Sequence, residues 1–556
     1  MRILVVGGVA GGLSFAARAR RLNEDAEIVV FEKGPHPSFS NCGLPYYVGG
    51  EVPFHDDLLL NSRESLYSKF KLDVRLNHEV IALDAATRTL KVSTPDGEVS
   101  ETYDKLVLSP GARAAAPPID GLDSARVQPL RTVEDAQAVV DLSEGAQNAV
   151  VIGGGFIGIE AAEAFAKRGI QTTIVEGSSH IMPPLDIEMA NLTAGALQSI
   201  GVRVIAGVKV EKIHQQPAHD LLILSNGEAL EAQVIVLSAG VVPNTEPFAA
   251  AGIKTDARGY IEIDCHGRTN LPDVFAVGDA VSQKTAITGQ CRPVALAGPT
   301  NRAGRLVADF IFDPEHAREL PEPLSTSIFR VGKMTVAMTG ANRAEFEAAQ
   351  IDYTTVHTHP LSHVSVIPGA EPMQLMMHFE NRTGRILGAQ GVGGKGVDKR
   401  IDAIATSLRG GLTAPDLIDL DLAYSPPYNS PKDPVNLLGY LADNILSGRL
   451  ELWYAQDIEA LPADALILDV RSEPEFRGGH LRGATCVPLG ELREKIADVR
   501  TKAAGKTVYV CDDTGATAWI ASQILRSNNL NAKVLSGGVN TAFAYHLENP
   551  GAVLEM

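Results

Sequence analysis

The residue best suited to chemistry in this chain is Cys42, in the segment Ser38-Phe39-Ser40-Asn41-Cys42-Gly43-Leu44-Pro45. The other four cysteines are distant in sequence, at positions 265, 291, 486 and 511. A thiol with a close partner can form an internal disulfide, whereas a lone thiol can form one only with sulfur brought from outside. We therefore expect the substrate to supply the second sulfur.

Two glycine-rich turns each follow an apolar strand and open a helix. The first contains Gly7, Val9, Ala10, Gly11 and Gly12, and the second Gly153, Gly155, Phe156, Ile157 and Gly158. An acidic residue follows the next strand of each unit: Glu32, before Lys33, and Glu176. Helix N-terminal amides bind a pyrophosphate and such an acid binds a ribose, so we predict two dinucleotide sites. The second turn matches GxGxxG fully, while the first has Val9 at the middle position.

Composition narrows the class of protein. The 556 residues carry a formal charge of -18, which opposes nonspecific nucleic-acid binding. Five scattered cysteines without a CxxC pair argue against a disulfide framework and a structural zinc site, and fit a reducing cytoplasm. No apolar stretch approaches the roughly 20 residues that span a bilayer. We expect a cytoplasmic protein without nucleic-acid or membrane partners.

Leu106 to Gly111 and Ile235 to Gly240 resemble crossover strands, and Leu271 to Ala280 resembles a strand that delivers Asp279 to a cofactor. Their order resembles the pyridine nucleotide-disulfide oxidoreductases. The resemblance implies FAD at the first unit, NAD(P)H at the second, and Asp279 on the ribityl chain. The residues implied at the cofactors are Gly7, Val9, Ala10, Gly11, Gly12, Glu32, Lys33, Gly111, Gly153, Gly155, Phe156, Ile157, Gly158, Glu176, Gly240, Gly278, Asp279 and Ala297. The charge of Glu176 favours NADH over NADPH.

The expected fold is α/β, with two interleaved Rossmann-like domains, an α+β dimerisation domain and a C-terminal α/β domain. We place the FAD domain at residues 1-115 and 244-321, and the NAD(P)H domain at 116-243. The dimerisation domain, at 322-446, implies a homodimer, and the last domain covers 456-556.

The segment around Cys42 is most similar to the coenzyme A disulfide reductase and persulfide reductase branch of that family, in which a single redox cysteine precedes Gly-Leu-Pro. On helical spacing, Ser14, Arg18 and Arg21 share one face, and guanidinium groups suit the phosphates of coenzyme A. The substrate-binding residues implied are Ser14, Arg18, Arg21, Ser38, Asn41, Lys71, Asn301 and Lys432. The branch's lysine aligns with Phe70, between Lys69 and Lys71, so either lysine is a candidate replacement.

The segment Tyr424-Ser425-Pro426-Pro427-Tyr428 resembles the branch's Tyr-x-Pro-Pro element. There the tyrosine reaches the partner's flavin and cysteine. Tyr424 is therefore our candidate acid, because a phenol can give a proton to a departing thiolate. The branch often has a second tyrosine before Pro-Gly-Ala, but this chain reads Val366-Ile367-Pro368-Gly369-Ala370.

The segments Asp469-Val470-Arg471 and Gly479-His480-Leu481, with Cys511 after an apolar strand, resemble the rhodanese fold. Cys511 is the implied nucleophile, but Ala516 stands where a loop arginine is expected. Asp512 and Asp513 add negative charge, which should raise the thiol pKa and repel thiosulfate. Two interpretations stay open: an inactive or regulatory domain, and sulfur transfer from a less charged or larger persulfide.

We predict NADH-driven reduction of coenzyme A disulfide, coenzyme A persulfide or polysulfide through a Cys42-coenzyme A mixed disulfide. One alternative is an NADH oxidase or peroxidase in which Cys42 forms a sulfenic acid. Another is a sulfur or redox sensor without catalysis. We expect no metal, although His357, His359 and His363 have a spacing that could converge on one ion.

Overall fold

The computed structural model describes residues 1–547 and 549–555. The chain forms two compact units, one of residues 1–181 with 198–325 and the other of residues 182–197 with 326–556. Among the described residues, no helix combines the length and apolar character needed to cross a membrane.

The first unit contains two parallel five-stranded sheets, each flanked by helices. One has the order β19-β7-β1-β2-β3. Its strands are β1 Arg2–Val6, β2 Glu27–Glu32, β3 Asp73–Leu76, β7 Lys105–Leu108 and β19 Val274–Ala276. The other has the order β12-β11-β10-β16-β9. Its strands are β9 Val127–Gln128, β10 Asn148–Ile152, β11 Gln171–Val175, β12 Val202–Ile205 and β16 Val234–Leu237. The apolar strands are buried on both faces, as parallel sheets require.

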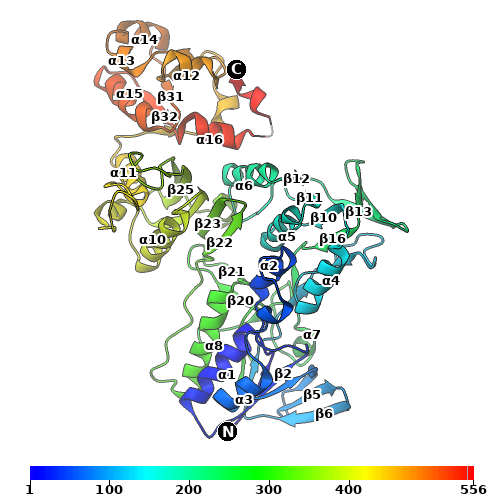
Figure 1. Cartoon of the computed structure of the whole chain (residues 1–556). Coiled ribbons are helices and arrows are strands. Elements are labelled where there is room, and N and C mark those ends of the chain that lie inside the picture. The colour runs from blue at the N-terminus through cyan, green and yellow to red at the C-terminus, as the bar shows by residue number, and fades with distance from the viewer. Residues whose placement is uncertain (548, 556) are drawn as a thin grey trace. The chain divides into compact units, whose positions relative to one another are not determined.

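Helices of the first unit follow the glycine-rich turns or cover the sheets. They are α1 Ala10–Leu22, α2 Leu44–Val48, α3 Arg63–Phe70, α4 Val133–Ser143, α5 Phe156–Lys167, α7 Glu246–Ala249 and α8 Ala297–Phe312. Helices α1 and α8 run side by side (Figure 1). They approach this closely because Gly304 has no side chain: a Cβ there would lie 2.5 Å from the Gly11 carbonyl oxygen.

Smaller sheets extend this unit. Two three-stranded antiparallel sheets comprise β4 Glu79–Asp84, β5 Thr89–Thr94 and β6 Gly97–Thr102, and β13 Val210–Gln215, β14 Asp220–Leu224 and β15 Ala229–Ala232. A mixed three-stranded sheet comprises β18 Ile261–Glu262, parallel to β20 Val281–Lys284, and β21 Cys291–Pro293, antiparallel to β20. Strands β8 Ala112–Ala114 and β17 Val241–Pro243 pair antiparallel directly after the two crossovers, so that Gly111 and Gly240 lie at opposite ends of this pair.

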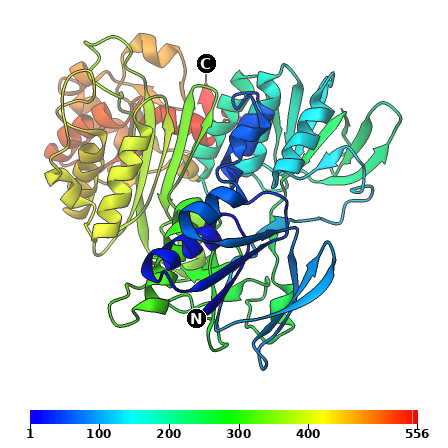
Figure 2. The same ribbon diagram turned by 60° about the horizontal axis from the view of Figure 1, so that its bottom comes forward.

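The large sheet of the second unit begins at Ser327. That antiparallel sheet has the order β22-β23-β26-β25-β24. Its strands are β22 Ser327–Val331, β23 Met334–Gly340, β24 Tyr353–Thr358, β25 Met373–Glu380 and β26 Ile386–Gly393. The helices are α6 Ile187–Ser199, α9 Arg343–Ala349, α10 Val397–Gly410 and α11 Pro434–Leu446. Helices α10 and α11, yellow in Figure 2, pack on the sheet through a common apolar core.

The C-terminal domain is a parallel sheet covered by helices. Its order is β27-β32-β31-β28-β30. The strands are β27 Leu452–Trp453, β28 Leu466–Asp469, β30 Thr485–Cys486, β31 Val508–Cys511 and β32 Ala532–Leu535, with a separate pair, β29 His480–Leu481 and β33 Leu554–Glu555. The helices are α12 Glu473–Arg477, α13 Leu489–Leu492, α14 Ile496–Ala503, α15 Ala516–Ser527 and α16 Gly538–Tyr545. The expected α/β fold class is confirmed.

Candidate active site

The two glycine-rich turns have the same construction. Val9 is the N-cap of α1 and Gly155 the N-cap of α5, with φ of -115° and -82°. Neither value lies in the left-handed region, so the middle position does not need the positive φ that favours glycine. By contrast, Gly7 and Gly153 have φ of +95° and +106°, where a Cβ would meet the backbone of Ser109 or Ser238. Some of these glycines therefore serve close packing.

Other residues of the first compact unit could contact the dinucleotides. A Cβ built on Gly155, Gly111 or Gly240 would meet nothing within 4 Å, which leaves space for a ligand against the backbone. The Thr300 hydroxyl, beside Gly11 and Gly278, is buried and has no hydrogen-bond partner among the described residues. An unpaired buried hydroxyl of this kind fits a site completed by a polar ligand.

Glu32 and Glu176 each lie beside their own turn. Glu32 accepts hydrogen bonds from the amides of Gly8, at 2.7 Å, and Gly34, at 2.8 Å. Burial raises the pKa of Glu32, and those two amides act against the rise. A carboxylate oxygen has two lone pairs, so each can still accept a ribose hydroxyl.

Cys42 lies in a short 3-10 helix, Asn41–Gly43, directly before α2, and its side chain is exposed. Helix α2 packs on the second nucleotide-binding unit, where the Tyr47 hydroxyl donates to Gln137 of α4 at 2.6 Å. On the other side, the Ser38 amide donates to the Gly8 carbonyl oxygen at 2.9 Å. The segment that contains Cys42 thus contacts the first glycine-rich turn on one side and the second nucleotide-binding unit on the other.

Two carboxylates act on the Cys42 thiol. Partial burial raises its pKa, and the charges of Glu160, on α5, and Asp279 raise it further. Asp279 in turn lies 3.3 Å from the Arg131 guanidinium, which also donates to the Ala112 carbonyl oxygen. Glu160 and Arg131 belong to no motif, so the sequence offered no signal for either.

The predicted coenzyme A residues occupy one surface of α1 and its neighbours. The Ser14 hydroxyl donates to Asn301 of α8 at 2.5 Å, and Arg18 pairs with Asp309 at 2.6 Å. Arg21 is exposed and lies over the Phe70 ring, 5.0 Å from its centroid. Lys71, exposed at the end of α3, lies over Tyr67.

The neighbouring Arg20 has a different environment. It is buried and donates to the carbonyl oxygens of Phe70, Lys71 and Glu24. Arg20 therefore stabilises the fold, while Arg21 remains available to a ligand. Ala297, the first residue of α8, and Lys33 and Asn41 are exposed.

Tyr424 and Lys432 lie in the second unit, in the exposed segment between α10 and α11. A buried arginine holds this segment: Arg400 of α10 donates to Asn429 at 2.7 Å and lies 3.3 Å from Asp433. Asp433 also caps α11 by accepting from Val435 at 2.8 Å. The segment is therefore anchored from within, with Tyr424 49 % exposed.

Cys511 ends β31 and is buried in the apolar core of the C-terminal domain. Burial raises the pKa of this thiol well above its ordinary value, and Asp469 adds to the rise, with smaller contributions from Asp512 and Asp513. Arg471 acts in the opposite direction, but it pairs with Asp469 at 2.7 Å and Asp513 at 2.9 Å.

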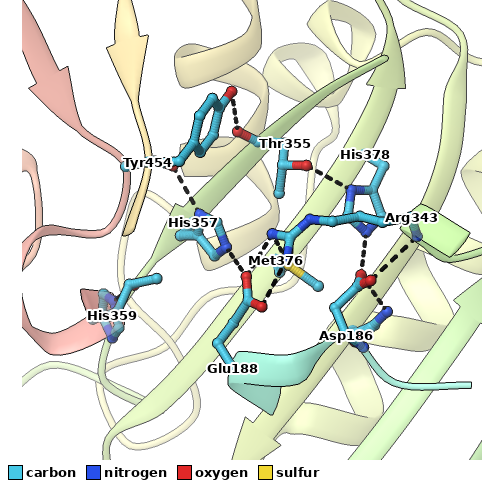
Figure 3. A network of polar contacts seen from close by, with 12 residues as sticks. Asp186, Glu188, Arg343, Thr355, His357, His359, Met376, His378 and Tyr454 are labelled. Carbon is cyan, nitrogen blue, oxygen red and sulfur yellow. Dashed lines mark hydrogen bonds and ion pairs between the residues drawn. The ribbon is translucent and has the colours of Figure 1, made fainter. Parts of the chain in front are cut away.

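The three histidines with metal-like spacing do not converge. In Figure 3, Glu188 of α6 lies between His357 and Arg343, at 2.8 Å and 2.5 Å. His357 also bonds Ser536, His359 bonds Thr541, and His363 bonds the Ile367 carbonyl oxygen. This polar network joins α6, the antiparallel sheet and the C-terminal domain within the second unit.

The absence of a metal stays a prediction. Cys265, His266 and Glu319 place ligand-type atoms within 4.8 Å of one another, with Cys265 and Glu319 exposed. The Cys265 thiol already interacts with the Glu319 carboxylate, which raises its pKa in addition to desolvation.

Paired dinucleotide-binding domains with a cysteine-containing segment that contacts both of them define a flavoprotein oxidoreductase that takes electrons from a pyridine nucleotide. Residues 1–296 match the family described as pyridine nucleotide-disulphide oxidoreductase, and residues 326–433 match its dimerisation domain. Residues 452–542 match the rhodanese-like domain. The chain belongs to the pyridine nucleotide-disulphide oxidoreductase family, whose members depend on FAD and NAD(P)H.

Several known proteins are similar to this chain over most of its length. A Staphylococcus aureus coenzyme A disulfide reductase is 32% identical over 445 residues, which cover 79% of this chain and 99% of the relative. The reduced Bacillus anthracis protein called CoADR-RHD has 35% identity and a TM-score of 0.96, covering 100% of this chain and 99% of its own. A NAD-dependent persulfide reductase from A. fulgidus has 34% identity and a TM-score of 0.90, covering 98% and 100%.

Proposed function

We propose that this enzyme uses NADH and FAD to reduce coenzyme A disulfide, coenzyme A persulfide or polysulfide, through a mixed disulfide between Cys42 and coenzyme A. The observation that carries the proposal is an exposed single thiol in a segment that contacts both nucleotide-binding domains. The names of the relatives supply two of the substrate classes, coenzyme A disulfide and persulfide.

The charges around Cys42 favour a disulfide over a free thiolate. Glu160 and Asp279 destabilise the negative thiolate, but they exert no such penalty on a neutral disulfide sulfur. Cys42 would therefore rest as the mixed disulfide and become a thiolate only when electrons arrive. Bound FAD would supply those electrons by relaying two of them from NADH.

The sulfur chemistry balances in both substrate classes. One NADH and one proton convert coenzyme A disulfide into two thiols, because the electron pair breaks one S–S bond. With coenzyme A persulfide, the same electron pair and proton release one thiol and one hydrogen sulfide. In either case Cys42 attacks one sulfur and the other sulfur leaves as a thiolate that needs a proton.

Coenzyme A would lie along the surface formed by α1, α3 and α8. Arg21 and Lys71 are exposed cations on that surface, and Ser14 and Asn301 offer polar groups beside them. Guanidinium and ammonium groups suit the phosphates of coenzyme A. Asn41 and Ser38 flank the cysteine, where the thiol end of the ligand must lie.

A homodimer would complete the site. The family's dimerisation domain is present, and the segment with Tyr424 and Lys432 is exposed and held from within. From a second copy, the Tyr424 phenol would donate the proton to the departing thiolate, and Lys432 would contact coenzyme A. The role of Cys511 stays a prediction, since its thiol is buried.

Anaerobic NADH oxidation with the three substrates in parallel tests the proposal, with released sulfide recorded. Cys42→Ser should reduce turnover at least about 1000-fold while NADH still bleaches the flavin. Cys291→Ser, at another exposed cysteine, is the matched control and should keep full activity. Undiminished disulfide turnover by Cys42→Ser would overturn the proposal, and turnover with oxygen alone would favour the oxidase.

A further inference from the structure

The loop after Cys511 already contains an anion of its own. The Asp512 carboxylate is 3 % exposed and accepts hydrogen bonds from the amides of Gly515, at 2.5 Å, and Thr517, at 2.8 Å. Gly515 is the N-cap of α15 and Thr517 lies in its first turn. These amides are the donors with which a helix N-terminus binds an external anion. Asp512 therefore holds the position that a bound anion would need.

The guanidinium near Cys511, that of Arg471, is also already engaged in hydrogen bonds. Arg471 donates through Nε and Nη2 to Asp469, through Nη2 to the Gly479 carbonyl oxygen, and through Nη1 to Asp513. A guanidinium has five N–H donors, so only one is left over. Three carboxylates and one guanidinium give this region a formal charge of -2.

The loop is fixed from the other side by the segment that begins α16. The Val539 amide donates to the Asp512 carbonyl oxygen at 2.7 Å, and the Asn540 amide donates to the Asp513 carbonyl oxygen at 3.1 Å. A Cβ on Gly538 would lie 2.4 Å from the Asp512 carbonyl oxygen, so the two segments touch through their backbones. Asp512 consequently has little freedom to leave its position.

We propose that Asp512 is a specificity-determining residue: its carboxylate occupies the anion site beside Cys511 and so excludes thiosulfate and similar anionic sulfur donors. The donor class left to the domain is a persulfide whose reacting sulfur is neutral. This goes beyond the function proposed for Cys42, because it concerns the rhodanese-like domain alone. Two effects combine: the amides are already bonded, and a dianion would meet like charges.

Thiosulfate transfer to cyanide by the full-length enzyme tests this inference without NADH. In that reaction the Cys511 thiolate attacks the outer sulfur of thiosulfate, the S–S bond breaks, and sulfite leaves with the bonding pair. Cyanide then takes the added sulfur as thiocyanate and restores the thiolate. The wild-type enzyme should form almost no thiocyanate, whereas Asp512→Gly should gain at least about tenfold, since like-charge contacts and occupied donors are removed.

Asp513→Gly is the matched control. It removes one nearby carboxylate, as Asp512→Gly does, but it leaves both loop amides bonded to Asp512. Occupation of the site predicts a clearly larger gain in Asp512→Gly than in Asp513→Gly, where only one like charge is removed. Formate should also inhibit Asp512→Gly in competition with thiosulfate, because it restores the missing carboxylate, and should not affect the wild type.

Folding can be checked in the same samples, because both tryptophans of the chain, Trp453 and Trp519, lie in this domain. If Asp512→Gly loses the native emission spectrum, thiocyanate formation is measured with Asp512→Asn instead. That variant removes the charge and keeps one hydrogen-bond acceptor. No gain in a folded Asp512 variant, or an equal gain in Asp513→Gly, would overturn the inference. Rapid thiosulfate transfer by the wild type would do the same.

Discussion

Glu32 and Glu176 make the same pair of backbone contacts in two different sheets. Glu32 bridges the amides of Gly8, at 2.7 Å, and Gly34, at 2.8 Å, and Glu176 bridges those of Gly154 and Ser178, both at 2.7 Å. Each carboxylate thus fixes a glycine-rich turn and places negative charge where a ribose must bind. Structural and nucleotide-selecting roles are combined in one side chain.

Glu176→Ala should weaken the preference for NADH. Its charge opposes the 2′-phosphate of NADPH, so its removal should lower the ratio of kcat/KM for NADH over NADPH by about tenfold or more. The loss of the Gly154 contact should also raise the KM for NADH. Flavin reduction by each nucleotide measures the ratio. An unchanged ratio, or the same change in the exposed variant Glu211→Ala, would contradict this role.

Glu160→Gln should make Cys42 more reactive. Because the Glu160 charge raises the pKa of the thiol, its removal should lower that pKa. At a fixed pH below the pKa, more thiolate is then present and alkylation by iodoacetamide is faster. The pH profile of Cys42 alkylation in the flavoprotein measures this. Glu144→Gln, an exposed change on the same domain, should leave the profile unmoved.

Arg400→Met should damage both stability and turnover. It removes a buried cation and leaves Asn429 and Asp433 without their shared donor, a change that costs about 3 kcal/mol or more. The segment with Tyr424 should then be cut faster by proteases, and kcat should fall. Urea unfolding, proteolysis and turnover are the measurements. The exposed change Lys395→Met should alter none of them, and an unaffected Arg400→Met would refute the anchoring.

Acid should destabilise the second unit through His359. Burial lowers the pKa of His359 to about 4, with His357 adding to the effect, while an unfolded histidine titrates near pH 6.5. The unfolded chain therefore binds more protons below about pH 6.5, and stability falls as the pH drops toward 4. We expect protonation of this side chain to lower the free energy of unfolding by about 2 kcal/mol, after allowing for its partial exposure.

Tryptophan fluorescence against temperature, at pH 7.5 and pH 5, measures that loss. His359→Gln should show a smaller decrease of the unfolding temperature than the wild type between these values. His316→Gln, whose histidine side chain is 79% exposed, should follow the wild type. An equal decrease in all three proteins would show that His359 is not the responsible group.

The fold could be predicted from local sequence patterns. Side chains that come together from distant parts of the chain could not be predicted in this way. The glycine-rich turns and their acids lie within single strand-turn-helix units, so spacing alone located them. Glu160 and Arg131 reach the Cys42 region from other parts of the fold, and no local signal marks them. Asp512 was recognised only as a repelling charge, because its two hydrogen bonds depend on the shape of the loop.

The division of the chain into units has a topological consequence. Residues 182–197 are inserted in the first unit's sequence but packed in the second, so the chain passes between units at 181/182, 197/198 and 325/326. A single cut after residue 325 therefore cannot release the second unit. A fragment starting at residue 326 would also lack Asp186 and Glu188, leaving His378 and Arg343 buried without their carboxylates.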